Sequence, residues 1–91
     1  MKIEYDPAKR DLTLLHRGLD MAETAEVFAG DLVTVEDSRQ DYGETRFTTV
    51  GFLQGRMVVV IWTRRGITRR IISLRKANAR EQAHYLSSLR P

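Results

Sequence analysis

Apolar residues recur at helical spacing over the first third of the chain, framed by start and stop signals. Asp6 followed by Pro7 is typical of a helix start, with Asp6 as the N-cap and Pro7 at the first helical position. Gly18 is placed to end this helix, because glycine readily adopts the left-handed conformation found just past a helix. We expect an apolar stripe along this helix at Ala8, Leu12, Leu15 and Leu19.

Two further helices are predicted from similar signals. Asp20 begins one over residues 20–30, and Glu23 follows it at the spacing of a capping box. Asn78 begins the other near the end of the chain, with Glu81 at the same spacing. The expected inner face of the second helix carries Met21, Ala25 and Phe28. The last helix is expected to have a narrow apolar stripe at Ala79, Ala83, Leu86 and Leu89.

Between the second and last helices, the apolar period changes to that of strands. We predict strands at residues 32–35, 45–53, 56–63 and 67–75, with residues 3–5 as a further candidate. The apolar run at residues 57–62 indicates a central strand buried on both faces. Residues 37–43 are polar and turn-prone. The short connections favour antiparallel pairing of consecutive strands.

These elements predict a single α+β domain over residues 1–91. It would contain two N-terminal helices, an antiparallel sheet of about four strands and a C-terminal helix. A chain of 91 residues can build one hydrophobic core of useful size, but not two separate domains.

Charge is distributed unevenly along the chain, although the net value is only +3. Residues 1–45 hold 5 Lys/Arg and 11 Asp/Glu, a net charge of −6, whereas residues 46–91 hold 10 Lys/Arg and 1 Asp/Glu, a net charge of +9. Nine of the ten cations in the second half are arginine, whose planar guanidinium suits phosphate oxygens. The second half is therefore predicted to meet an anion, with RNA favoured, unless it pairs with the acidic first half.

Several kinds of site lack their usual residues. The chain contains no Cys, which excludes disulfides, thiolate metal sites and a Cys nucleophile. We find no metal-ligand spacing and no phosphate-binding glycine loop, so we expect neither a metal nor a cofactor. The first residues show no signal-peptide pattern, and the longest apolar run, residues 57–62, is too short to span a bilayer. We expect a cytoplasmic protein without membrane contact.

Arginines on the predicted strands form the main candidate site. As a set they predict a cationic groove that holds a phosphate backbone, although each one singly also fits a solvated or ion-paired side chain. Strand periodicity limits how many can share a surface. Arg70 and Arg75 would point to opposite faces of a regular strand, unless the strand bulges or one of them lies at its end.

Cleavage of RNA also requires proton transfer. One group must activate the 2′-hydroxyl, a cation must stabilise the pentavalent phosphate, and another group must protonate the leaving oxygen. Arginine suits the second task. Glu44, two residues before Arg46, is the carboxylate best placed for the first, although a turn residue paired with Arg46 explains it equally well. His16 and His84 are the only imidazoles, and a lone histidine is more typical of a structural or solvent-facing position.

Three short motifs occur together in this chain. It opens with Tyr5-Asp6-Pro7-Ala8-Lys9 and continues with Gly43-Glu44-Thr45-Arg46. It ends with Arg70-Ile71-Ile72-Ser73-Leu74-Arg75-Lys76-Ala77, followed by Glu81 and Tyr85. These motifs resemble the BrnT family of bacterial type II toxins, which are RelE-like ribonucleases. The resemblance covers nearly the whole chain, and the last motif is the most specific.

The first helix departs from the family pattern. The family usually has His directly before the glycine at position 18, where this chain has Arg17, and Lys where it has His16. We therefore carry no catalytic role over to Arg17 and treat His16 only as a doubtful candidate.

The resemblance implies a RelE-like fold and a toxin that inhibits translation by cutting RNA. It also implies neutralisation by a BrnA-like antitoxin, in a hetero-oligomer that contacts operator DNA only through the antitoxin. Our leading hypothesis is a metal-independent endoribonuclease. Its expected catalytic residues are Arg46, Arg70, Arg75, Glu44, Lys9 and Tyr85. Its expected further RNA-binding residues are Arg64, Arg69, Lys76 and Arg80.

Two alternatives stay open at this point. The Arg17 departure motivates the first, a catalytically weak or inactive module of the same fold that binds RNA or the antitoxin. In the second, the basic face binds only protein and is covered by an acidic antitoxin segment.

Overall fold

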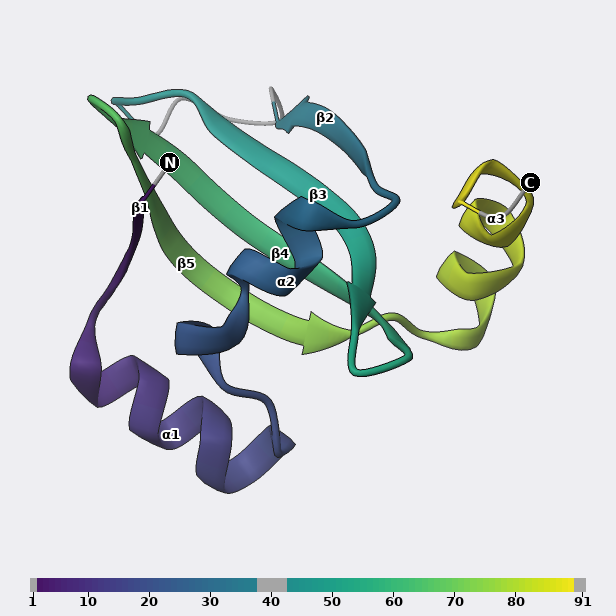
Figure 1. Ribbon diagram of the computed structural model, residues 1–91, viewed down its shortest axis with the longest axis horizontal. Helices are drawn as coiled ribbons and strands as arrows, with labels where there is room; N and C mark the ends of the chain where they lie inside the picture. The colour runs from purple at the N-terminus through teal and green to yellow at the C-terminus, as the bar shows by residue number, and fades with distance from the viewer. Residues whose placement is uncertain (1, 38–42, 90–91) are drawn as a thin grey trace.

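The computed structural model describes residues 2–37 and 43–89 and confirms the α+β class. Figure 1 shows a twisted sheet, with α2 crossing in front of it and α1 and α3 at opposite sides of the view. In chain order the elements are β1 (Lys2–Tyr5), α1 (Pro7–Arg17), the 3₁₀ helix η1 (Met21–Glu23), α2 (Ala25–Ala29), β2 (Val33–Asp37), β3 (Arg46–Leu53), β4 (Arg56–Arg65), β5 (Thr68–Lys76) and α3 (Ala79–Leu89). Most of the predicted turn at residues 37–43 lies outside the described residues.

Within the described residues, the strands form one five-stranded sheet in the order β1-β5-β4-β3-β2. Strands β2 to β5 pair antiparallel with their neighbours in sequence, as the short connections predict. Strand β1 instead pairs parallel with β5, so the prediction of about four antiparallel strands is wrong in this respect. The reason is that connection lengths inform only on consecutive strands, whereas β1 and β5 lie at opposite ends of the chain and meet through tertiary structure.

Strand β5 contains one residue more than the facing part of β4. Ile61 is paired with Ser73, but the next residue, Trp62, is paired with Ile71, so Ile72 is the extra residue of a β-bulge. One extra residue reverses the alternation of side chains beyond it. Ile71 and Leu74 therefore enter the same core although they are three residues apart.

Strand β4 is buried on both faces, as its apolar run predicts. Val58, Val60 and Trp62 point into a core on the α2 face, while Met57 and Val59 point into a second core beneath α3. The first core is completed by Leu19, Met21, Val27, Leu53, Ile71 and Leu74. The second is completed by Val50, Ala77 and Leu89. The sheet is thus covered on one face by α2 and on part of the other by α3.

Helix α1 begins and ends where the sequence predicts. The Asp6 carboxylate accepts a hydrogen bond from the backbone N–H of Ala8 at 2.9 Å, and Pro7 occupies the first turn. At the other end Gly18 adopts a left-handed conformation, with φ of 68°, and its N–H donates to the carbonyl of Leu14. In the described part of the chain, no helix combines the length and apolar character that crossing a membrane requires.

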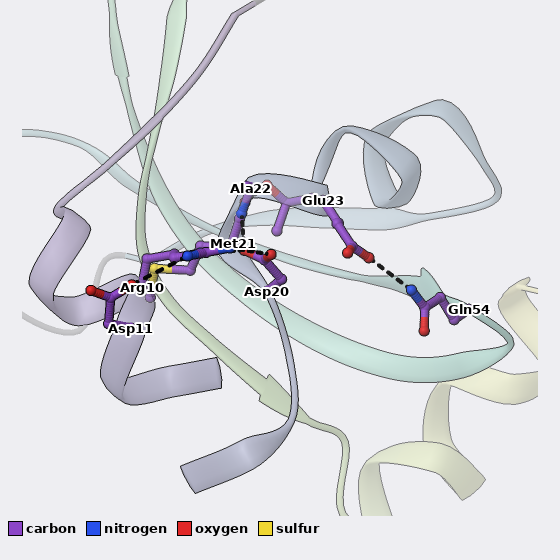
Figure 2. A network of polar contacts seen from close by, with 8 residues as sticks. Arg10, Asp11, Asp20, Met21, Ala22, Glu23 and Gln54 are labelled. Atoms are coloured by element: carbon purple, nitrogen blue, oxygen red, sulfur yellow. Dashed lines mark hydrogen bonds and ion pairs between the residues drawn. The ribbon is translucent and has the colours of Figure 1, made fainter. Parts of the chain in front are cut away.

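The predicted apolar stripe of α1 does not face the core over Ala8, Leu12 and Leu15, whereas Leu19, just beyond the end of the helix, is buried. Leu12 is 57% exposed and Leu15 is 75% exposed, whereas Arg10 and Thr13 on the opposite side are half-buried. Arg10 donates two hydrogen bonds to the Asp20 carboxylate, at 2.8 and 2.7 Å (Figure 2). This ion pair turns the polar side of α1 toward the domain, which the spacing of the leucines could not reveal.

The single helix predicted over residues 20–30 is split into η1 and the five-residue α2. Asp20 caps η1 by accepting a hydrogen bond from the backbone N–H two residues on, at 2.9 Å. Glu23 accepts a hydrogen bond from the side chain of Gln54 at 2.7 Å (Figure 2). The buried hydroxyl of Thr24 donates to the carbonyl of Met21 at 2.8 Å. Asp20 is therefore an N-cap, as predicted, but of the short 3₁₀ helix η1.

Candidate functional site

A row of polar residues crosses the sheet from edge to edge. Arg70 of β5 is paired with Thr63 of β4, and Thr63 is paired with Arg46 of β3. The row continues to Glu4 on β1 and to Asp37 on β2. Residues directly opposite each other in neighbouring strands share a face of the sheet. Two of the predicted catalytic residues, Arg46 and Arg70, therefore lie on the same face.

Arg75 lies on this face too. It is paired with Val59, whose side chain belongs to the core beneath α3, and the side chain of residue 63 on β4 alternates onto the same face as that of residue 59. A regular strand would have separated Arg70 from Arg75, but the bulge at Ile72 reverses the alternation between them. We call this surface, defined by Arg46, Arg70 and Arg75, the arginine face.

Arg70 is held at the edge of the sheet by an ion pair with the parallel strand β1. Its Nη1 lies 3.1 Å from Oε1 of Glu4, and the two side chains are 28% and 42% exposed. The pair is therefore open to solvent on one side. Guanidinium has five N–H donors, so this contact leaves donors for a further anion.

Arg75 is positioned by the start of α3. Its guanidinium donates two hydrogen bonds to the Glu81 carboxylate, at 2.8 and 2.9 Å. Glu81 and Asn78 also cap the helix reciprocally at 2.9 and 2.8 Å, which confirms the predicted capping box. The bonds from Arg75, and then that from the Asn78 N–H, lower the pKa of Glu81 to about 2. The same contact raises the pKa of Arg75, so both groups are charged at neutral pH.

Glu44 lies at the end of the sheet where β3 begins and β4 ends. It lines an open pocket of about 520 Å³ together with Thr63, the middle residue of the polar row, and with Phe47 and Arg64. Its carboxylate is 3.7 Å from the guanidinium of Arg65, and its side chain is 35% exposed. Glu44 is thus an accessible carboxylate beside the polar row.

Tyr85 lies on the side of α3 that faces the sheet. It is half-buried against the core beneath that helix. Its ring meets that of His84 edge-on, with the centroids 4.7 Å apart. Tyr85 follows Glu81 by one helical turn, so the two side chains lie on the same side of α3.

Arg64 and Arg69 lie on the opposite face of the sheet. They are paired with each other across β4 and β5. The guanidinium of Arg69 lies over the ring of Phe28 at 4.1 Å from its centroid and over that of Trp62 at 5.2 Å. Burial, and then the charge of Arg64, lowers the pKa of Arg69. Arg69 is therefore packed beneath α2 rather than grouped with Arg70.

Lys76 and Arg80 are exposed, at the end of β5 and the start of α3. They flank the Arg75–Glu81 ion pair in sequence and could extend a cationic surface around it. Among residues 2–37 and 43–89, no three His, Asp or Glu side chains gather closely enough to hold a metal ion.

Lys9, His16 and Arg17 line a pocket of about 330 Å³ between α1 and β5. Met21, which belongs to the core on the α2 face, lines the same pocket. These three residues are therefore grouped with one another and not with the arginine face. Arg17 also donates from Nη1 to the backbone carbonyl of Leu74 at 2.8 Å, which gives this departure from the family pattern a structural contact.

Sequence reasoning missed the carboxylates that hold the arginines. Glu4 was not a candidate, because its contact with Arg70 depends on the parallel pairing of β1 and β5. Glu81 was found as a helix cap and as part of the last motif, but not as the partner of Arg75. Its spacing from Asn78 gave that signal, whereas its contact with Arg75 depends on how α3 leaves the sheet.

The chain was compared with known families and proteins. The family described as "Ribonuclease toxin, BrnT, of type II toxin-antitoxin system" matches residues 5–81. This range includes the arginine face, Glu44 and Lys9, and it ends before Tyr85. No curated protein matches the chain.

Proposed function

Because the chain belongs to the BrnT family of ribonuclease toxins of type II toxin–antitoxin systems, we propose that it is a metal-independent endoribonuclease that inhibits translation. Membership of a type II family also implies an antitoxin partner. We propose that this antitoxin is BrnA-like, that it binds the chain in a hetero-oligomer, and that operator DNA is contacted only through it. The proposed site of action is the cytoplasm.

The observation that carries this proposal is the grouping of Arg46, Arg70 and Arg75 on one face. Arginine can bind two phosphate oxygens at once through its planar fork. Donors fixed in advance where charge develops supply a large share of catalysis in many enzymes. Glu4 and Glu81 fix two of these guanidinium groups before any substrate arrives, which supports a preorganised site.

The reaction we propose is attack of a 2′-hydroxyl on the neighbouring phosphate, with loss of the 5′-oxygen of the next nucleotide. The arginine face would stabilise the negative charge that accumulates on the phosphate oxygens. This role is the one that a divalent cation performs in many other phosphate-cleaving enzymes, and it supports the metal-independent form of the proposal.

Glu44 is the stronger of the two proposed proton acceptors. It lines a pocket with Thr63 of the polar row, and its side chain is accessible. Lys9, the other candidate, lines the pocket under α1. Glu81 contacts Arg75 directly, but its pKa of about 2 makes it a weak base. Tyr85 on α3 would position a nucleobase or a phosphate of the RNA near Arg75.

The remaining cations are proposed to bind RNA away from the reacting phosphate. Lys76 and Arg80 flank Arg75 and would lengthen the path of the backbone. Arg64 borders the pocket that contains Glu44. Arg69 is the weakest of the four, because its guanidinium is engaged with two aromatic rings.

The proposal is tested by expressing the chain alone in a bacterium and by incubating the purified chain with RNA in the presence of EDTA. We expect growth arrest, and cleaved RNA despite the chelator. Healthy cells together with uncut RNA would contradict the proposal. Cleavage that stops with EDTA and returns with added Mg²⁺ would retain the ribonuclease and reject the metal-independent mechanism.

The second candidate is a catalytically weak or inactive module that binds RNA or the antitoxin. The ion pairs of Arg70 and Arg75 favour it to some extent, since an incoming phosphate must compete with two carboxylates. The Arg17 departure does not, because Arg17 lies on the α1 side and contacts a backbone carbonyl. Binding of RNA that weakens steeply with salt, without any cleavage, would identify this alternative.

A further inference from the structure

The outer side of α1 is an apolar surface that nothing in the described chain covers. Leu15 is 75% exposed, Leu12 is 57% exposed, and Ala8, one turn earlier, is also exposed. These three residues follow one another at helical spacing and form a continuous stripe, which we call the leucine stripe. A contiguous apolar stripe on a helix usually packs against something, whereas scattered exposed leucines need no explanation.

The orientation of α1 is fixed by contacts on its other side. Arg10 is bound to Asp20 by two hydrogen bonds (Figure 2), and Arg17 donates to the carbonyl of Leu74. Rotating α1 to bury its leucines would break these bonds and leave Asp20 without its cationic partner. The bonds on the other side of α1 therefore keep the leucine stripe exposed to solvent.

Beside the leucine stripe lies a pocket lined by both apolar and basic side chains. Leu12, Met21 and Ile72 line it with apolar side chains, and the exposed residues Lys9 and Arg17 line it too. The volume of about 330 Å³ can receive an inserted aliphatic or aromatic side chain. Asp11, on the far side of the stripe, is already paired with Arg10 at 3.2 Å. The charged residues that line the pocket, Lys9 and Arg17, are thus both cations.

We propose that the leucine stripe and this pocket bind an amphipathic helical segment of the antitoxin, with apolar side chains on one face and acidic side chains flanking them. The proposal rests on the proposed function, which supplies the antitoxin. A helix laid along an apolar groove is a common mode of peptide recognition. Charge selects the partner: an acidic segment would neutralise Lys9 and Arg17, whereas a second copy of this chain would bring the same cations together.

The test uses the full chain and the antitoxin encoded by the reading frame that adjoins its gene. Leu12→Asp/Leu15→Asp is compared with Ile67→Asp, because Ile67 is an equally exposed apolar residue, at 72%, in the turn between β4 and β5. Affinity is measured by titration calorimetry at two salt concentrations, and circular dichroism checks the fold. We expect the double variant to bind at least about tenfold more weakly, as for loss of an apolar anchor. Ile67→Asp should bind like the parent chain.

Several results would overturn the inference. Unchanged affinity of the double variant would place the antitoxin elsewhere, and equal weakening by Ile67→Asp would show a general effect of added charge. A dimer of the isolated chain that dissociates on Leu12→Asp/Leu15→Asp would assign the stripe to a second copy. Growth arrest by the double variant that the antitoxin no longer relieves would support the inference. If the parent chain neither arrests growth nor cuts RNA, the proposed function fails, whatever the binding result.

Discussion

Arg70 and Arg75 lie on the same face of β5 although they are five positions apart, an offset that places side chains on opposite faces of a regular strand. The extra residue at Ile72 makes this possible, because it reverses the alternation of side chains between the two arginines. Each guanidinium is then held by a carboxylate from a different element, Glu4 of β1 for Arg70 and Glu81 of α3 for Arg75. The bulge therefore brings Arg70 and Arg75 together on the arginine face, while Arg69 stays on the opposite face.

Replacing the arginines of the arginine face should reduce RNA cleavage while the fold persists. For Arg70→Ala and for Arg75→Ala we expect the cleavage rate to fall by about 10²–10³, the usual loss of one transition-state donor. The rate is measured on purified protein, with circular dichroism as the check of folding. Arg56→Ala is the matched control, since Arg56 is exposed at the start of β4. Full activity of Arg75→Ala with an unchanged spectrum would remove Arg75 from the mechanism.

The Arg75–Glu81 ion pair should make stability depend on acid pH. The pKa of Glu81 is lowered from 4.5 to about 2 in the folded chain, so the stabilisation is complete above about pH 4.5 and is lost as the pH falls through about 2. Arginine keeps its proton throughout this range. Glu81→Gln should lower the free energy of unfolding at pH 7 by about 1 kcal/mol, after allowance for partial exposure. Urea unfolding at several pH values should show the two proteins converging near pH 2; a constant difference would refute this linkage.

Gly51 permits α2 to approach β3 closely. A Cβ atom at this position would lie 2.9 Å from Cγ1 of Val27, which is fully buried. Gly51→Ala should therefore force a shift in the core and lower the free energy of unfolding by about 1–3 kcal/mol. Gly30→Ala is the comparison, because its Cβ would meet its nearest neighbour only at 3.7 Å. Equal melting temperatures of the two variants would show that α2 can move away freely.

The Asp20 carboxylate performs two tasks at once, as the cap of η1 and as the partner of Arg10. Asp20→Ala should destabilise the domain by at least the cost of a lost cap, about 1 kcal/mol. Asp11→Ala removes the other carboxylate near Arg10, but Asp11 is 71% exposed and should matter little. Thermal unfolding compares the two. A greater effect of Asp11→Ala would mean that the network in Figure 2 does not anchor α1.

How far the sequence predicts this fold depends on whether each signal is local. The caps at Asp6 and Asn78, the helix end at Gly18 and the antiparallel pairing of β2 to β5 all follow from residues close together in the chain. The split of the second helix into η1 and α2 was not predicted, and neither was the bond between Glu23 and Gln54, which are distant in sequence. The outward position of the leucines on α1 was not predicted either. It depends on the bond between Arg10 and Asp20, a residue that lies outside this helix.

The candidate site, like the fold, could be predicted only in part from the sequence. Residue types and motifs singled out Arg46, Arg70 and Arg75 and led to the family that matches residues 5–81. Lys9 and Arg69, chosen on the same grounds, lie away from the arginine face. Lys9 belongs to α1, and Arg69 is packed beneath α2. Composition can identify cations, but it cannot assign each of them to a surface.

The sequence by itself determined the α+β class, the positions of the helix caps, a strand buried on both faces and a basic second half. These properties depend on local propensity, periodicity and charge count. Only the tertiary structure decided that β1 joins β5, that Glu4 and Glu81 hold the arginines, and that Arg70 and Arg75 share a face. The physical reason is that strand register and ion pairing are set by contacts between distant segments, and one extra residue in a strand moves every later side chain to the other face.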